Sequence, residues 1–181
     1  MNNAFFKPYP VIKSDRLELK MISYKDVKDV FAIYSDDDVC RYSDIVKHKN
    51  VFHSLEYIFY SKRKFYNNAC LTFGVYLKST GRLIGTVSIT EIASDYTAAE
   101  IGYSFNKNYR QKYYGSEAVK AFCEYLFKNT PVKTITAKTM VENIASKKLL
   151  IKNGFVFLGL VKNGGQRHGQ MIDVNMFELK G

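Results

Sequence analysis

The sequence predicts an α+β protein with one mixed, mostly antiparallel central sheet of about seven strands flanked by about four helices. Short segments alternate apolar and polar residues, as half-buried strands do, while other segments carry apolar residues at helical spacing. These two kinds of segment follow one another without repeats, which is typical of an α+β chain. Because the 181 residues contain no linker rich in Pro, Gly or Ser, we expect a single domain, residues 1–181.

The first third of the chain is predicted to contain one strand and two helices. Residues 16–22 alternate apolar and charged side chains. Ser23 can then cap a helix that runs through Asp37, and residues 53–66 form a second helical stretch. The apolar side of this second helix is predicted to consist of Leu55, Ile58, Phe59 and Tyr66.

A meander of three strands is predicted next. Residues 71–77 form its first strand, and the turn at residues 78–82 contains Gly81, which can adopt a positive φ. Residues 83–90 return as the second strand, and residues 100–105 make the third.

The rest of the chain is predicted to contain two helices around a strand, followed by a hairpin. One helix follows Ser116 and stops at Pro131. Residues 134–139 are rich enough in β-branched side chains to form a strand. Asn143 begins another helix, which ends before Gly154. The closing hairpin is predicted to consist of strands 155–161 and 171–179 and the polar loop 162–170. The resulting order, βαα-βββ-α-β-α-ββ, favours a mixed sheet.

The charge of the chain favours anionic ligands. Lys and Arg number 27 against 17 acidic residues, a net charge of +10, although solubility alone explains such a charge equally well. The basic residues are spread along the chain without a separate basic tail, so direct nucleic-acid binding is not expected. No apolar run approaches the ~20 residues of a membrane-spanning helix, and no secretory signal opens the chain. We therefore expect a cytoplasmic protein without membrane contact.

The cysteines, Cys40, Cys70 and Cys123, indicate neither a disulfide framework nor a zinc site. They are odd in number, far apart and without Cys-x-x-Cys spacing. We expect them to be buried free thiols, and we predict no metal site.

Residues 110–118, Arg-Gln-Lys-Tyr-Tyr-Gly-Ser-Glu-Ala, join the third meander strand to the next helix. A loop that enters the first turn of a helix presents unpaired N–H groups and the positive end of the helix dipole. Such a position binds anions, especially phosphate. The loop is therefore a predicted phosphate-binding site.

A second segment, residues 143–155, reads Asn-Ile-Ala-Ser-Lys-Lys-Leu-Leu-Ile-Lys-Asn-Gly-Phe. Together the two segments resemble the GNAT superfamily of acyl-CoA-dependent N-acetyltransferases. The closer likeness is to the branch that includes the ribosomal-protein N-terminal alanine acetyltransferases. The element order also matches, so the resemblance extends from Arg16 to Leu179. It implies acetyl-CoA as the acyl-donating cosubstrate.

The family's phosphate loop has the form Gln/Arg-x-x-Gly-x-Gly/Ala, and Arg110 and Gly115 match its ends. Tyr113 stands where the family usually has its first Gly. A negative φ would accommodate Tyr113, whereas a positive φ would strain the backbone by about 1–3 kcal/mol and weaken cofactor binding. By resemblance the cofactor-binding residues are Ser104, Phe105, Arg110, Gln111, Lys112, Tyr113, Tyr114, Gly115, Ser116 and Asn143.

The second segment implies two further roles. Asn143 can cap its helix, and by resemblance its amide also contacts the pantetheine arm or a nearby phosphate. Ser146 lies at i+3 on the same face, where its hydroxyl can reach the sulfur end of the cofactor. Many GNAT enzymes carry a tyrosine acid on this helix, but the corresponding position is Leu150. Ser146 or a bound water is the expected substitute, and an ordinary helix hydroxyl is the simpler alternative for Ser146.

Residues 99–103, Ala-Glu-Ile-Gly-Tyr, resemble the strand that precedes the phosphate loop in the same branch. By resemblance its backbone pairs with the pantetheine amides, and an N–H near Ser104 or Phe105 polarises the thioester oxygen. Glu100 is the carboxylate placed to act as general base, because an amine acceptor is mostly protonated at neutral pH. A solvent-facing strand residue is the alternative interpretation of Glu100.

These features predict an N-acetyltransferase in which acetyl-CoA and a primary amine react directly in a ternary complex. Glu100 and Ser146 are the predicted catalytic residues. The acceptor is the α-amine of a protein N-terminus or a small-molecule amine, and the protein is expected to be a monomer or a homodimer. The alternative is a catalytically silent GNAT-fold module that binds an acyl-CoA or a protein partner.

Overall fold

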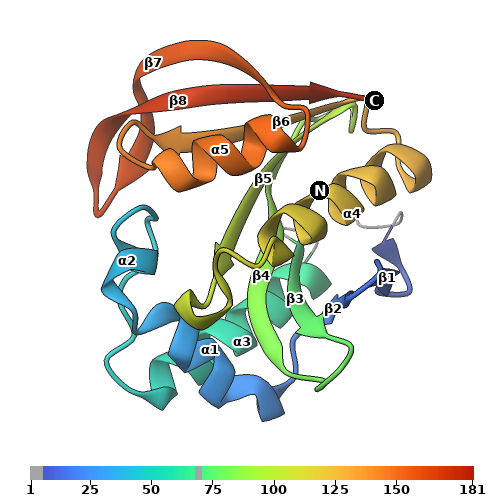
Figure 1. The fold of residues 1–181 in the computed structure, drawn as a ribbon, viewed down its shortest axis with the longest axis vertical. Helices are drawn as coiled ribbons and strands as arrows, with labels where there is room; N and C mark the ends of the chain where they lie inside the picture. The colour runs from blue at the N-terminus through green and yellow to red at the C-terminus, as the bar shows by residue number, and fades with distance from the viewer. Residues whose placement is uncertain (1–5, 68–70) are drawn as a thin grey trace.

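One mixed sheet organises the protein (Figure 1). A computed structural model describes residues 6–67 and 71–181. In these residues eight strands follow the order β1-β2-β3-β4-β5-β6-β8-β7, accompanied by five α-helices. β5 and β6 are parallel, and the other neighbouring strands of the described sheet are antiparallel. The predicted α+β class with a mixed, mostly antiparallel sheet is therefore confirmed.

The N-terminal elements are β1 (Ile12–Lys13), β2 (Leu17–Met21), α1 (Val27–Tyr34), α2 (Asp37–Cys40) and α3 (Val51–Tyr66). Ser23 starts the helical region with a capping box, in which its side chain and that of Asp26 both bond to backbone N–H groups. Asn50 caps α3 by accepting from the N–H groups of Phe52 and His53.

Three details of this region differ from the prediction. β1 is an additional strand, and the predicted first helix ends at Tyr34 because Asp36 caps a separate short helix, α2. The apolar side of α3 was also wrong, since Phe59 and Tyr66 are 50% and 65% exposed. α3 packs mainly against α1, which buries Ile58, as predicted.

The predicted meander is confirmed. β3 (Leu71–Leu77), β4 (Leu83–Ile92) and β5 (Ala98–Phe105) pair in succession. Gly81 has a φ of +68° in the turn between β3 and β4, a conformation that glycine adopts without a steric penalty.

The remaining elements are α4 (Tyr114–Asn129), β6 (Thr134–Met140), α5 (Ile144–Lys152), β7 (Val156–Arg167) and β8 (Gln170–Lys180). α4 is the crossover that the parallel pair β5–β6 requires. The predicted polar loop at 162–170 was wrong. Residues 165–167 pair with residues 170–172, so the turn is confined to His168 and Gly169.

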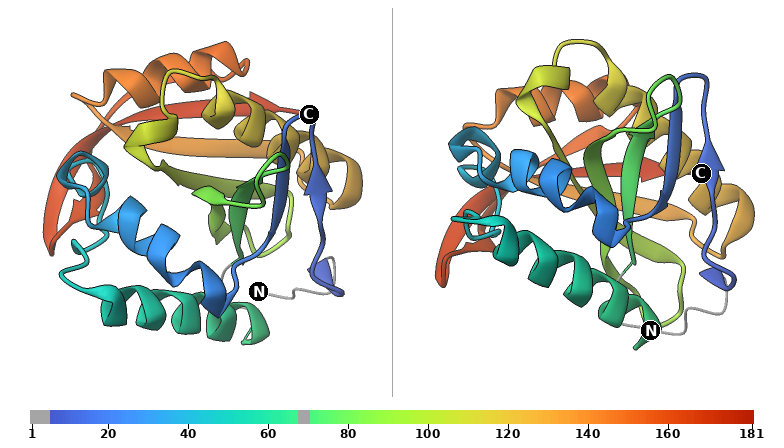
Figure 2. Two further views of the ribbon diagram at one scale, coloured as in Figure 1. Left: turned by 60° about the horizontal axis from the view of Figure 1, so that its bottom comes forward. Right: turned by 90° about the horizontal axis from the view of Figure 1, so that it is seen from below.

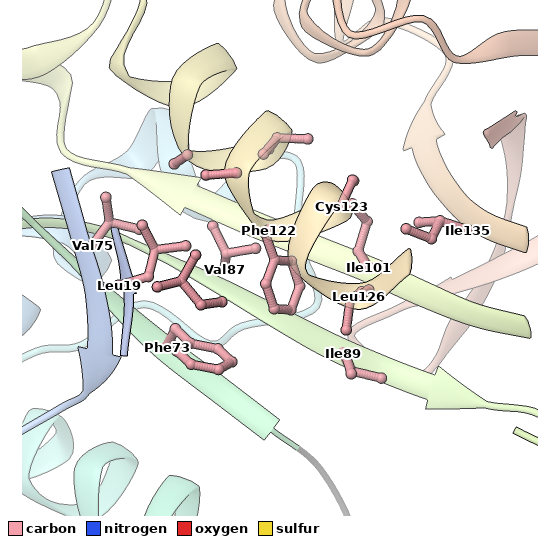
Figure 3. Packing of buried hydrophobic residues seen from close by; sticks show 14 of the residues in the cluster. Leu19, Phe73, Val75, Val87, Ile89, Ile101, Phe122, Cys123, Leu126 and Ile135 are labelled. Carbon is pink, nitrogen blue, oxygen red and sulfur yellow. The ribbon is translucent and has the colours of Figure 1, made fainter. Parts of the chain in front are cut away.

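Helices cover both faces of the sheet, with α1 and α3 on one side and α4 and α5 on the other (Figure 2). In the main core, Phe122 and Leu126 of α4 pack over strand residues such as Phe73 and Ile101 (Figure 3). A smaller core around Tyr34 lies between α1, α3 and the sheet. Among the described helices, none is long and apolar enough to cross a membrane.

Candidate active site

A cleft of about 640 Å³ opens where β5 and β6 diverge. The two strands pair only over Ala98–Glu100 and Thr134–Thr136 in the described structure. Beyond Glu100, the edge of β5 that faces β6 borders the cleft, so its backbone N–H and C=O groups can pair with a ligand. On this side the lining includes residues 101–105, Lys138, Thr139, Asn143, Ala145, Ser146 and Leu149.

The opposite wall comes from α1, α2, α3 and the loop after α2. The buried Tyr34 hydroxyl bonds to the hydroxyls of Tyr57, at 2.9 Å, and Thr86, at 2.7 Å. Asp44 lies on the rim and accepts a 2.6 Å hydrogen bond from the backbone of His168, at the tip of the β7–β8 hairpin. This wall was not predicted, because apolar helical spacing indicates only that Tyr34 is buried.

The structure brings five of the predicted site residues into the cleft lining: Ser104, Phe105, Arg110, Asn143 and Ser146. Six others form the adjoining loop and the first turn of α4, outside the lining: Gln111, Lys112, Tyr113, Tyr114, Gly115 and Ser116. Glu100 also lies outside the lining, although Lys138 and Thr90, which both contact its side chain, belong to the lining.

The predicted phosphate loop leads into the N-terminus of α4, whose N-cap residue, Tyr113, makes no side-chain capping hydrogen bond. Its first-turn N–H groups and the helix dipole therefore favour an anion. Gly115 allows this end of α4 to approach its neighbours closely, since a Cβ there would lie 2.9 Å from Leu149 and 3.2 Å from Phe105. The loop is thus held beside the end of β5 that lines the cleft.

Two cleft hydroxyls from different elements meet on the α5 side. Asn143 caps α5, as predicted, by accepting from the N–H of Ser146 at 3.1 Å. The Ser146 hydroxyl lies 2.7 Å from the phenol oxygen of Tyr103 on β5. Leu150, at the position of the family's tyrosine acid, is fully buried in the main core. Hydroxyl groups at the α5 side of the cleft therefore come from Ser146 and Tyr103.

Glu100 forms an ion pair with Lys138, at 2.8 Å, and accepts a 3.3 Å hydrogen bond from the Thr90 hydroxyl. Both partners line the cleft. The hydrogen bond to Glu100 raises the pKa of Lys138, so this ammonium group stays charged beside the carboxylate. Glu100 is therefore a partly buried, paired carboxylate at the margin of the cleft rather than a free surface group.

Thr139 supplies a further polar group that the sequence analysis missed. Its side chain is 5% exposed and lines the cleft, and its hydroxyl has no hydrogen-bond partner among the described residues. A buried hydroxyl without a partner is costly, so a polar ligand in the cleft would satisfy it. The β-branched residues at 134–139 predicted only that Thr139 belongs to a strand.

Two further predictions concerned the cysteines and metal binding. Cys40 and Cys123 are free and buried, as predicted, and Cys70 lies outside the described residues. Within residues 6–67 and 71–181, no group of three or more His, Cys, Asp and Glu side chains is arranged to hold a metal ion.

A family model described as an acetyltransferase (GNAT) domain matches residues 16–156. The chain belongs to the GNAT acetyltransferase family. It is 26% identical over 171 residues to the uncharacterized N-acetyltransferase YoaA of Bacillus subtilis (strain 168), covering 94% of this chain and 97% of that protein. It is 30% identical over 166 residues to the uncharacterized N-acetyltransferase p20 of Bacillus licheniformis, covering 92% and 93%. The predicted enzyme class, an acetyl-CoA-dependent N-acetyltransferase, is confirmed.

Solved structures share the fold of this GNAT acetyltransferase. An acetyltransferase (GNAT family) from Bacillus anthracis superposes with a TM-score of 0.84 at 24% identity, covering 94% of this chain and 98% of that chain. The ribosomal L7/L12 alpha-N-protein acetyltransferase RimL, in complex with coenzyme A, superposes with a TM-score of 0.81 at 18% identity. The match covers 94% of this chain and 98% of that chain. The predicted GNAT fold is therefore confirmed.

Tyr113 of this GNAT enzyme adopts a positive φ, the conformation that is expected to strain the backbone. Its φ is +62°, in the left-handed region. The side chain is 66% exposed, and the Lys152 ammonium lies 3.6 Å from the ring centroid. A cation–π contact to α5 thus partly offsets the backbone strain.

Substitution of Tyr113 separates these two contributions. We expect Tyr113→Ala to lose the ring contact and keep the strain, whereas Tyr113→Gly loses both. The glycine variant should therefore have a free energy of unfolding about 1 kcal/mol above that of the alanine variant. Urea denaturation of both variants measures the difference, and an alanine variant as stable as the glycine variant would show that the position carries no strain.

Glu117 anchors the first turn of α4 to the segment before β2. Its carboxylate accepts hydrogen bonds from the Ser14 hydroxyl, at 2.7 Å, and from the backbone and guanidinium of Arg16, at 2.8 and 2.6 Å. Burial alone raises the pKa of Glu117, but these bonds and the charge of Arg16 outweigh burial and lower it. The contacts hold the loop-proximal end of α4 in place.

Because the pKa of Glu117 is lowered on folding, its charge stabilises the fold above the unfolded value of about 4.3. This stabilisation disappears as the pH falls through the lower folded pKa. We expect Glu117→Gln to reduce the free energy of unfolding by about 1–2 kcal/mol at neutral pH and much less in acid. Glu124→Gln, on the exposed side of α4, is the control and should change it by less than about 0.5 kcal/mol. Equal effects of the two substitutions across pH would contradict the anchoring role.

Proposed function

We propose that the enzyme transfers the acetyl group of acetyl-CoA directly to a primary amine, within one domain spanning residues 1–181. The cleft between the diverging strands β5 and β6 is the observation that carries this proposal, because it adjoins an uncapped helix N-terminus. A ligand with a phosphate end and an amide-containing arm fits both features. We propose a monomer or homodimer acting in the cytoplasm.

Several groups of this chain would hold acetyl-CoA. The backbone of Ser104 and Phe105 would pair with the amide-containing arm, and the N–H groups at residues 110–116 would bind its phosphates. The amide of Asn143 and the unpartnered hydroxyl of Thr139 line the same cleft and can bond to polar groups of the arm. When bound, acetyl-CoA supplies the activated thioester.

The proposed catalytic roles belong to groups at the cleft. Glu100 accepts the proton of the acceptor ammonium, directly or through water, and Lys138 keeps its carboxylate oriented. A backbone N–H near Ser104 or Phe105 stabilises the oxyanion. Ser146 returns a proton to the departing sulfur.

Direct transfer without an acyl-enzyme is supported by the positions of the cysteines. None of the described residues that line the cleft is a cysteine. Burial raises the pKa of the Cys123 thiol to about 12, so this thiol stays protonated and is a poor nucleophile. Isolation of a stable acetyl-cysteine intermediate would overturn this part of the proposal.

The acceptor is proposed to be the α-amine of a protein N-terminus, with a small-molecule amine as the alternative. RimL, which shares the fold, is named for acetylating the α-amine of a ribosomal protein. The wall that faces β5 carries Tyr34, Asp38, Tyr42 and Asp44, which offer aromatic and anionic contacts to an ammonium group.

Calorimetric titration with acetyl-CoA, desulfo-CoA and free CoA tests the proposal, followed by turnover with a peptide carrying an N-terminal alanine. We expect micromolar binding of acetyl-CoA and amine-dependent release of CoA. Absence of binding at millimolar ligand would refute the assigned cofactor site. Binding without turnover of any amine, including small-molecule amines, would favour the catalytically silent module.

A further inference from the structure

The hydrogen bond between Tyr103 and Ser146 joins two elements that form one side of the cleft. Tyr103 projects from β5, and Ser146 lies in the first turn of α5. Both residues line the cleft, and their hydroxyl oxygens are 2.7 Å apart. Loss of this contact would leave the Ser146 hydroxyl free to rotate.

The environment of Tyr103 favours its phenol as the donor in this hydrogen bond. Burial raises the pKa of the Tyr103 phenol, so it remains protonated and needs an acceptor. The Ser146 hydroxyl at 2.7 Å is well within range, whereas the Ser146 carbonyl at 3.5 Å is at the limit of a hydrogen bond. In the proposed arrangement the Tyr103 phenol donates and the Ser146 hydroxyl oxygen accepts.

A serine hydroxyl that accepts a hydrogen bond keeps its own hydrogen for a second partner. Because Ser146 lines the cleft, that hydrogen can point toward a bound ligand. Donation from Tyr103 also stabilises negative charge on the serine oxygen, which makes the Ser146 hydroxyl a better proton donor.

We propose that Tyr103 is a positioning residue that orients the Ser146 hydroxyl as a hydrogen-bond donor to the cofactor sulfur. This inference rests on the proposed function. In the reaction the amine nitrogen bonds to the acetyl carbon, the carbon–sulfur bond breaks, and its electron pair stays on sulfur. Sulfur takes the Ser146 proton, and cleft water relays the second nitrogen proton, released when the tetrahedral intermediate collapses, to the serine oxygen. Tyr103 keeps its proton throughout, and Glu100 holds the first proton, which the acceptor ammonium lost before the attack.

The thiol of bound CoA provides a test that needs no acceptor amine. Its titration is followed by the ultraviolet absorbance of the thiolate, with the desulfo-CoA complex as the blank. An oriented donor stabilises the thiolate, so the thiol should titrate lower on the enzyme than in solution. We expect Tyr103→Phe and Ser146→Ala each to raise its pKa by about one unit relative to wild type. The double variant should shift it no further than Ser146→Ala alone.

Two controls separate this effect from misfolding. Affinity for desulfo-CoA, which has no thiol, should be the same in wild type and both variants if the cleft is intact. Tyr125→Phe removes a hydroxyl from α4 outside the cleft lining. The thiol of CoA bound to this variant should have the same pKa as on wild type.

The outcomes distinguish this inference from the proposed function. If Ser146→Ala shifts the pKa but Tyr103→Phe does not, the role of Tyr103 is refuted and that of Ser146 stands. If neither variant shifts it while CoA still binds, the proton-return roles of both residues are refuted and the cofactor site stands. Additive shifts in the double variant would show that Tyr103 acts independently of Ser146. Failure of wild type to bind CoA would refute the proposed function and this inference together.

Discussion

Glu100→Gln lowers the rate of acetyl transfer by about 10²–10⁴ at neutral pH, if Glu100 removes the proton from the acceptor amine. Glutamine is nearly isosteric but cannot accept that proton. The rate should recover partly at high pH, because more of the amine is then deprotonated before it binds. Steady-state kcat and kcat/KM as functions of pH, with an amine that wild type acetylates, measure the effect.

The ion pair with Lys138 makes a control necessary, because Glu100→Gln also leaves that ammonium without its partner. Glu91 on β4 lies opposite Glu100 in the strand register and is exposed. Glu91→Gln therefore removes a nearby negative charge without touching the proposed base, and its rate should stay close to that of wild type. An unchanged rate for Glu100→Gln at saturating amine would remove Glu100 from the mechanism.

Gly85→Ala is expected to have the largest effect on stability. Gly85 pairs with Phe105 across β4 and β5. A Cβ there would lie 2.3 Å from the Phe105 ring and 2.7 Å from the backbone oxygen of Ser104. Since the backbone cannot rotate away, the strands must separate, and we expect a loss of about 3 kcal/mol in the free energy of unfolding. For a chain of this length, that lowers Tm by roughly 6–12 °C.

The same substitution should weaken acetyl-CoA binding, because it displaces the segment of β5 that is proposed to pair with the cofactor. Thermal denaturation and calorimetric titration measure the two effects. Gly102→Ala on β5 is the control for the stability effect alone, because Gly102 itself lines the cleft. Its Cβ would approach only the Thr90 methyl, at 3.2 Å, and the Ser88 hydroxyl, at 3.9 Å. If Gly85→Ala is as stable as Gly102→Ala, the close approach of β4 and β5 does not constrain this site.

Much of the fold was predictable because its signals are local. α5 has a capping residue, Asn143, and a left-handed glycine, Gly154, that act within a turn of the helix ends. The three meander strands were likewise predicted from short apolar runs and from the turn that contains Gly81. The misassigned loop at 162–170 was polar and rich in glycine, yet cross-strand pairing with β8 extends the hairpin through most of it. Pairing partners are not encoded in such a segment alone.

The candidate site, like the fold, has some features that the sequence predicts and others that only the tertiary structure decides. Sequence alone was sufficient to identify the family and to predict a phosphate loop at 110–118 and roles for Glu100 and Ser146, because these predictions depend on short, contiguous patterns. Tertiary structure decided that Glu100 pairs with Lys138 and that Ser146 meets Tyr103, 43 residues away in the chain. It also decided the positive φ of Tyr113. Side-chain distances between separate elements depend on how strands diverge and helices pack over them, and no local pattern specifies those distances.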